Sequence, residues 1–198
     1  MPMMPQALMD AAAAFGLVAI AELGDKSQLV CMGLAARHRA IPVLAGAVLA
    51  FALLNLIAVL FGASLAHWLP PWLIAAAVAV LFAVFGIRAL LAAQAPEEEV
   101  VCPSAPGYGV LLSTSMLIFV AEFGDKTQLA VAGLAGALPP LAIWAGATAG
   151  LALTSLLGVT AGRTLLQRLP QAWIHRLSAV LFLGFAVVAA AKALNGLG

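Results

Sequence analysis

Apolar residues run almost without interruption along this chain, in stretches long enough to cross a lipid bilayer. A membrane-spanning helix needs about 20 consecutive apolar residues. Proline pairs and short polar segments separate six stretches of at least that length. We therefore predict an all-α, polytopic membrane protein with six transmembrane helices, over residues 10–36, 41–66, 71–94, 107–135, 139–164 and 172–194. The first and fourth are long for a bilayer of about 30 Å, so they should be tilted or broken.

The sequence also repeats itself at a constant offset of 100 residues. AELGDKSQL at 21–29 corresponds to AEFGDKTQL at 121–129, and the match continues beyond these motifs without a gap. Each half holds three predicted spans, and because three is odd, the second half must enter the membrane from the opposite side. We predict two inverted three-helix repeats, residues 1–94 and 107–198, joined by an acidic loop over residues 95–106. Inverted repeats commonly bind a transported substrate where the two halves meet.

Composition agrees with a membrane protein. Of the 198 residues, 65% are hydrophobic and 9% are charged, whereas about 25% are charged in soluble domains. The net charge of +1 gives no case for nucleic-acid binding, and the two cysteines, Cys31 and Cys102, lack metal-ligand spacing. The N-terminal segment contains neither Lys nor Arg and no cleavage signal. This favours a bacterial plasma-membrane protein inserted by its own first helix.

Basic residues set the predicted orientation, because short loops rich in Lys and Arg stay in the cytoplasm. They gather after the first span, near the end of the third and around the fifth connection: Arg37, Arg39, Arg88, Arg163, Arg168 and Arg176. Lys192 alone lies on the opposing side. Both termini are therefore predicted to be non-cytoplasmic, with the acidic loop at Glu97–Glu99 in the cytoplasm.

The two motifs place four carboxylates and two lysines in the middle of apolar spans. A charge at the centre of a span costs roughly 2.5–3.5 kcal/mol on insertion scales, so six unpaired charges would cost on the order of 15–20 kcal/mol. Charges in this position are expected to pair, to face the protein interior and to serve a function. A transport site is the default interpretation.

The spacing within the motifs suits a hard metal cation. Residues three apart on an unbroken helix are separated by about 60° around its axis and share a face. The predicted metal ligands are therefore Glu22, Asp25, Gln28, Glu122, Asp125 and Gln128. Such an oxygen-only set suits Mn²⁺, Ca²⁺ or Mg²⁺, and the absence of His and Cys from both motifs argues against Zn²⁺ and copper.

The lysines complete the charge balance. Lys26 and Lys126 stand four residues after Glu22 and Glu122, the spacing that favours an ion pair on a helix. Four acids and two lysines sum to a charge of −2. One divalent cation or two protons would cancel it equally well, which is the physical basis of proton–metal antiport.

Two further pairs of motif residues have predicted roles. Ser27 and Thr127 point away from the glutamates on an ideal helix, so we expect them to bond a backbone carbonyl or a neighbouring helix unless the chain unwinds locally. Gly24 and Gly124 are the predicted break points, and candidate hinges, of the two long spans.

Three other functions remain open at this point. Export of a small organic solute would favour an asymmetric, partly apolar pocket. An intramembrane hydrolase would separate the roles of its acids by giving them different environments, whereas two near-identical motifs do the reverse. A membrane scaffold would use the charges only to fix helix packing. We therefore expect a transporter without a cofactor rather than an enzyme.

The doubled Glu-x-Gly-Asp-Lys-[Ser/Thr] motif resembles the signature of the Mn²⁺/Ca²⁺ cation–proton antiporters, the family that includes the Golgi transmembrane protein 165. Both copies are intact, at residues 22–27 and 122–127, and the resemblance covers nearly the whole chain. It implies export of Mn²⁺ in exchange for protons by a bacterial member, with Ca²⁺ as the second candidate cargo. The central loop is shorter than is usual in eukaryotic relatives.

Overall fold

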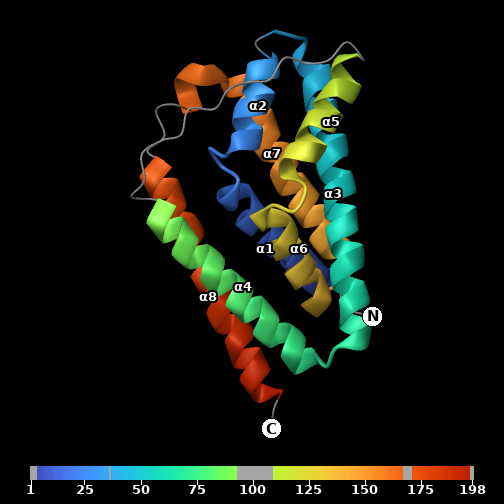
Figure 1. Ribbon diagram of the computed structural model, residues 1–198, viewed down its shortest axis with the longest axis vertical. Helices are drawn as coiled ribbons and strands as arrows, with labels where there is room; N and C mark the ends of the chain where they lie inside the picture. Colours follow the sequence, from blue (N-terminus) through green and yellow to red (C-terminus); the bar gives the residue numbers. More distant parts are fainter. Residues whose placement is uncertain (1–3, 36, 93–108, 167–170, 197–198) are drawn as a thin grey trace.

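The computed structural model describes residues 4–35, 37–92, 109–166 and 171–196, and within these ranges it leaves out the side chains of Lys26 and of residues 161–166 among others. All regular structure in the described part is helical, as predicted (Figure 1). The helices are α1 (Met4–Ala21), α2 (Lys26–Ala35), α3 (Ala40–Trp68), α4 (Pro71–Ala92), α5 (Val110–Glu122), α6 (Lys126–Ala137), α7 (Pro140–Leu166) and α8 (Gln171–Asn195). The predicted acidic loop, and with it Cys102, lies outside the described residues.

Four helices are long and apolar enough to cross a membrane, and they coincide with the second, third, fifth and sixth predicted spans. Their candidate spanning segments are Ala40–Trp68, Pro71–Leu91, Pro140–Thr160 and His175–Asn195. The first and fourth predicted spans are each divided into two helices, α1 with α2 and α5 with α6. α1 and α5 are apolar but shorter than a full span.

Both interruptions fall at a motif glycine. Gly24 and Gly124 each have φ of +80°, a left-handed conformation that glycine adopts without the steric cost borne by other residues. The amide of Asp25 bonds the carbonyl of Glu22 at 3.2 Å, and the amide of Asp125 bonds that of Glu122 at 3.1 Å. Each motif therefore forms a tight turn between two helices.

Helices of one half pack mainly against helices of the other half. α1 and α2 lie against α7, whereas α5 and α6 lie against α3 (Figure 1). A Cβ atom added at Gly46 would stand 2.4 Å from the carbonyl oxygen of Leu111, and one added at Gly146 would stand 2.1 Å from that of Ala11. These two close approaches are related by the same offset of 100 residues as the sequence repeat.

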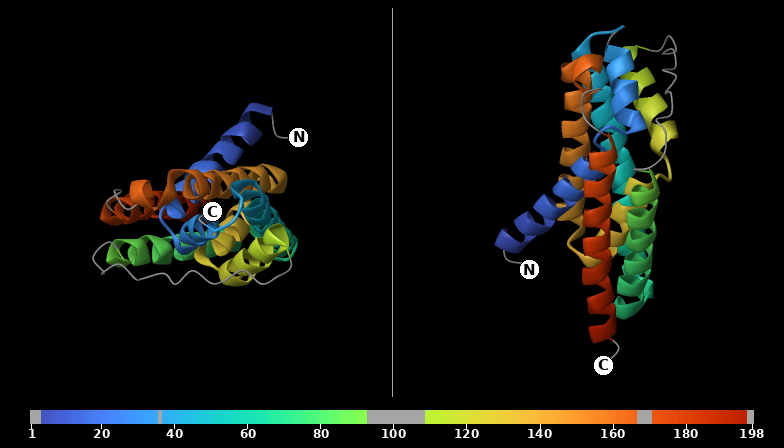
Figure 2. Two further views of the ribbon diagram at one scale, coloured as in Figure 1. Left: turned by 90° about the horizontal axis from the view of Figure 1, so that it is seen from above. Right: turned by 90° about the vertical axis from the view of Figure 1, so that its left-hand side faces the viewer.

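α4 and α8 form a separate pair along one flank of the molecule (Figures 1 and 2). Their contact is aromatic, with the ring centroids of Phe82 and Phe182 5.8 Å apart and those of Phe85 and Phe182 5.7 Å apart. Phe82 and Phe182 are equivalent positions of the repeat, so this pair also meets at matching residues. The two motif turns join helices of the remaining six, α1 to α2 and α5 to α6.

Candidate metal centre

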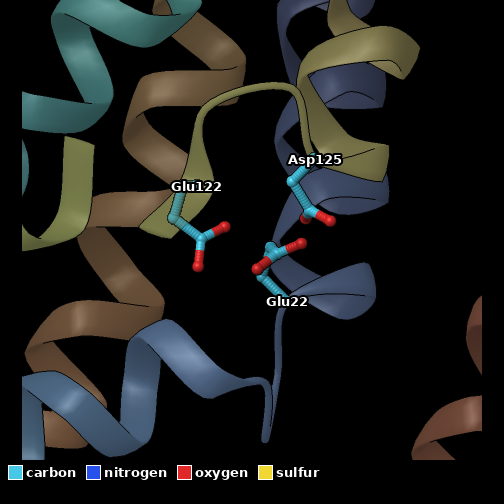
Figure 3. A group of neighbouring side chains, drawn as sticks. All are labelled: Glu22, Glu122 and Asp125. Atoms are coloured by element: carbon cyan, nitrogen blue, oxygen red, sulfur yellow. The ribbon is translucent and has the colours of Figure 1, made fainter. Parts of the chain in front are cut away.

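Three motif carboxylates converge from the two motif turns (Figure 3). Glu22 follows the end of α1, Glu122 is the last residue of α5, and Asp125 precedes α6. One oxygen from each lies within 4.8 Å of the other two. Glu22 is fully buried and Glu122 is 9% exposed. The two halves of the chain therefore contribute to one cluster, as a shared site requires.

Glu22 is the most deeply buried member of the cluster. Its Oε1 accepts a hydrogen bond from the hydroxyl of Thr127, in the other half. Its Oε2 is buried and has no hydrogen-bond partner among the described residues. Such an atom in a native structure calls for an explanation, and an ion that binds there is one of the few available. The unpartnered oxygen makes Glu22 suited to bind a cation.

Lys126 corrects a prediction made from helical spacing, whereas Thr127 follows the exception stated with its prediction. The chain is broken at Gly124, and Thr127 bonds Glu22 of the other half. Lys126 pairs with Asp25 and approaches Glu22 Oε1 at 3.7 Å, so its ion pairs also cross between the halves. The physical reason is the turn at Gly124, which removes the four-residue helical relation between Lys126 and Glu122. The side chain of Lys26 lies outside the described residues.

Asp25 stands beside the cluster rather than within it. Its side chain is 24% exposed and is held by the ammonium of Lys126. The cluster of three acids therefore contains both acids of the second motif but only Glu22 of the first. Ser27, the counterpart of Thr127, is buried.

The two motif glutamines make hydrogen bonds with both ends of their amides. Gln28 Oε1 accepts from the backbone amide of Gly24 at 2.6 Å, and its Nε2 donates to the carbonyl of Thr154 at 3.0 Å. Gln128 repeats this arrangement with Gly124 at 2.6 Å and Leu54 at 3.1 Å. Neither amide oxygen joins the carboxylates in this structure.

A small pocket adjoins the second motif. Its lining combines motif side chains with residues of the two long helices: Phe51, Leu54, Asn55, Glu122, Asp125, Thr127, Gln128 and Leu151. Asn55 is 1% exposed, and its Nδ2 donates to Thr148 Oγ1 at 3.1 Å. Asn55 was not among the predicted site residues, and its signal in the sequence is a lone asparagine in an apolar span. Glu122 and Asp125 both line this pocket, whereas Glu22 is not among its lining residues.

The cluster offers three carboxylate oxygens that lie close enough to one another to bind the same cation. Oxygen ligands of this kind suit hard cations such as Ca²⁺ and Mg²⁺. Carboxylate oxygens are also the donors that Mn²⁺ accepts. Burial between apolar helices favours a bound charge that neutralises these acids.

Apolar helices long enough to cross a membrane, together with a buried cluster of acids built from two like motifs, define a multi-pass membrane transporter of cations. The family model described as "Divalent cation/proton antiporter GDT1" matches residues 10–97 and 110–196. The chain belongs to this family, which confirms the resemblance stated from its motifs. No solved structure matches the chain.

Similar proteins come from plants and from bacteria. "Protein PAM71, chloroplastic" of Arabidopsis thaliana is 33% identical, over 91% of this chain and 56% of the relative. "GDT1-like protein sll0615" of Synechocystis is 31% identical, over 87% of this chain and 92% of the relative. The "Putative manganese exporter" of Vibrio cholerae is 31% identical, over 87% of this chain and 86% of the relative.

Proposed function

We propose that this chain exports Mn²⁺ across a bacterial plasma membrane in exchange for protons, with Ca²⁺ as a second cargo. Glu22, Asp25, Glu122 and Asp125 are the proposed cation ligands, and all four contact the ion in at least one state of the transport cycle. The same oxygens take up protons when the metal leaves. Export and the choice of Mn²⁺ draw on the name of the Vibrio cholerae relative and on the hard, carboxylate-rich ligand set.

The observation that carries the proposal is the meeting of Glu22 with Glu122 and Asp125 inside the protein. Three carboxylates this close repel one another unless protons or a cation occupy them. The buried, unpartnered Oε2 of Glu22 adds a direct reason for an ion to bind. A structural ion pair needs neither a third acid nor an unpartnered oxygen, so the scaffold hypothesis explains less of the arrangement.

The proposed membrane arrangement has six crossings in two inverted halves, residues 1–94 and 107–198. Each broken pair of helices, α1 with α2 and α5 with α6, forms one crossing. The repeated contacts at Gly46 and Gly146 support equivalent roles for the two halves. Both termini are proposed to be non-cytoplasmic, on the distribution of basic residues. The unwound turns at Gly24 and Gly124 are the proposed hinges.

Coupled fluxes in proteoliposomes test this function. Purified protein is reconstituted with a pH-sensitive dye inside, and uptake of Mn²⁺, Ca²⁺, Mg²⁺ and Zn²⁺ is compared. We expect Mn²⁺ entry with proton exit, and loss of both fluxes in Asp125→Asn. Asp10→Asn, which removes an acid of α1 outside the motifs, is the matched control and should transport normally. Folded protein that moves none of the four metals would contradict the proposal and favour an organic solute or a scaffold role.

A further inference from the structure

The backbone at each motif turn carries an amide that the helix cannot satisfy. Phe123 has an extended ψ of 118°, so the peptide that joins it to Gly124 is turned away from the helical direction and the N–H of Gly124 points away from α5. Gly24 has the same φ of +80° as Gly124 and lies in a turn closed by the equivalent hydrogen bond. An unpaired N–H within the apolar part of a membrane protein costs several kcal/mol. The side-chain oxygens of Gln28 and Gln128 meet these two N–H groups at 2.6 Å in each half.

The other end of each amide reaches the opposite half of the protein. Gln28, on α2, donates to the carbonyl of Thr154 on α7, and Gln128, on α6, donates to the carbonyl of Leu54 on α3. Residues 54 and 154 are equivalent positions of the repeat. Each motif turn is therefore tied to the long helix of the other half, and the two ties are reciprocal.

The packing around Gln28 shows how closely this tie is built into the fold. Gln28 is 1% exposed. A Cβ atom added at Gly158, one helical turn beyond Thr154, would stand 2.9 Å from the Cγ of Gln28 and 2.7 Å from its carbonyl oxygen. The glycine lets α2 approach α7 closely enough for the amide to reach the Thr154 carbonyl.

We propose that Gln28 and Gln128 are positioning residues rather than cation ligands: each holds a motif turn, and the acids on it, against the opposite half. An amide that uses its oxygen on a backbone N–H and its nitrogen on a backbone carbonyl fixes both the shape of the turn and its place. Displacement of α7 relative to the first turn strains the Gln28 tie, and displacement of α3 relative to the second turn strains the Gln128 tie. This proposal rests on the cation site proposed above and replaces the two glutamines in the predicted ligand set.

Gln28→Glu distinguishes the two roles because they predict opposite results. A glutamine that binds Mn²⁺ directly would be replaced by a stronger ligand, so the affinity would hold or rise. A positioning glutamine would lose its only donor, and a carboxylate oxygen would face the Thr154 carbonyl. We expect Mn²⁺ binding at least about tenfold weaker, the scale on which supporting residues act at metal sites.

A second readout needs no metal. A protonated glutamate has the same shape as glutamine and regains an O–H donor, so the thermal stability of metal-free Gln28→Glu should approach that of the native protein as the pH falls. Gln128 is less buried than Gln28, and Gln128→Glu should show the same pH dependence of thermal stability as Gln28→Glu. If Gln28→Glu fails to fold at every pH, the Gln128→Glu variant tests the positioning role.

Native or tighter Mn²⁺ binding by either folded variant would overturn the positioning role. A stability difference from the native protein that is unaltered by pH would overturn it as well. If the native protein moved no metal while the variants showed the expected stability profile, the proposed function would fail and the positioning role would stand.

Discussion

Replacing Lys126 with methionine removes the charge that links the two motifs without removing a proposed ligand. The ammonium of Lys126 holds Asp25 and lies 3.7 Å from Glu22 Oε1. A cation that binds Glu22 must therefore share its carboxylate with this ammonium. We infer that the ammonium of Lys126 competes with the metal ion for these carboxylates. It neutralises the acids when no metal is bound, and it repels a metal ion that binds to them.

The magnitude follows from the distances. A cation about 2.3 Å from the Glu22 oxygen stands roughly 6 Å from the ammonium, when the 3.7 Å separation is added. The repulsion between a single and a double charge at that distance is about 1.4 kcal/mol at the permittivity of water and about 5.5 kcal/mol at an effective permittivity of 20. The lysine side chain is 33% exposed, so solvent screens its charge and we use the lower repulsion energy. It corresponds to an affinity gain of about tenfold.

The assay is Mn²⁺ binding to the purified protein at mildly alkaline pH, where protons compete least for the carboxylates. Lys126→Met should bind Mn²⁺ at least about tenfold more tightly than the native protein. Its transport should show a lower KM and a lower turnover, because release is slowed. Lys192→Met, a matched change at an exposed lysine near the C-terminus, should leave binding unchanged. Weaker binding by Lys126→Met would refute the competitor role and show that the ammonium helps to build the site.

Two further predictions concern contacts between the halves. Gly146→Ala places a Cβ 2.1 Å from the carbonyl oxygen of Ala11, so α1 and α7 must move apart at a cost of about 1–3 kcal/mol. The melting temperature of this variant should fall, whereas that of Gly184→Ala, which has open space at its Cβ, should not. Equal melting temperatures for the two variants would contradict the close packing. Thr127→Val removes the hydroxyl that bonds Glu22, at a cost of about 1–3 kcal/mol. Its loss of thermal stability should shrink when Mn²⁺ is added, and an equal loss with and without metal would contradict the site.

Much of the fold followed from hydrophobicity alone, because a bilayer demands apolar helices of nearly fixed length. The four long candidate spans coincide with predicted ones. The excess length of the first and fourth predicted spans, with a glycine in each motif, also located the breaks at Gly24 and Gly124. The family and the class of transport followed from the doubled motif and are confirmed by the family match.

Contacts across the halves could not be derived from spacing along the chain. The prediction that Lys126 pairs with Glu122 assumed an unbroken helix, but the turn at Gly124 turns the lysine toward Asp25 and Glu22. The same turn brings Thr127 to Glu22. The break at the motif glycine was predicted. The directions of the side chains that follow it, Lys126 and Thr127, depend on backbone angles that the sequence pattern does not encode.

Asn55 shows a different limit. A single asparagine in an apolar span most often bonds a neighbouring helix, and Asn55 does bond Thr148. It also lines the pocket beside Glu122 and Asp125, a position set by the packing of α3 against α5 and α6. Its counterpart in the repeat is Ser155, so the repeat offered no second asparagine to mark the position as part of the site.

The location of bound Mn²⁺ is the most direct test of a cation site shared by the two motifs. Anomalous scattering from crystals of the protein grown with Mn²⁺ would place the ion without reliance on its coordination. Our account predicts one strong peak within bonding distance of Glu22 from the first half and of Glu122 or Asp125 from the second. A peak held by the acids of one half only, or a peak away from both motifs, would contradict it.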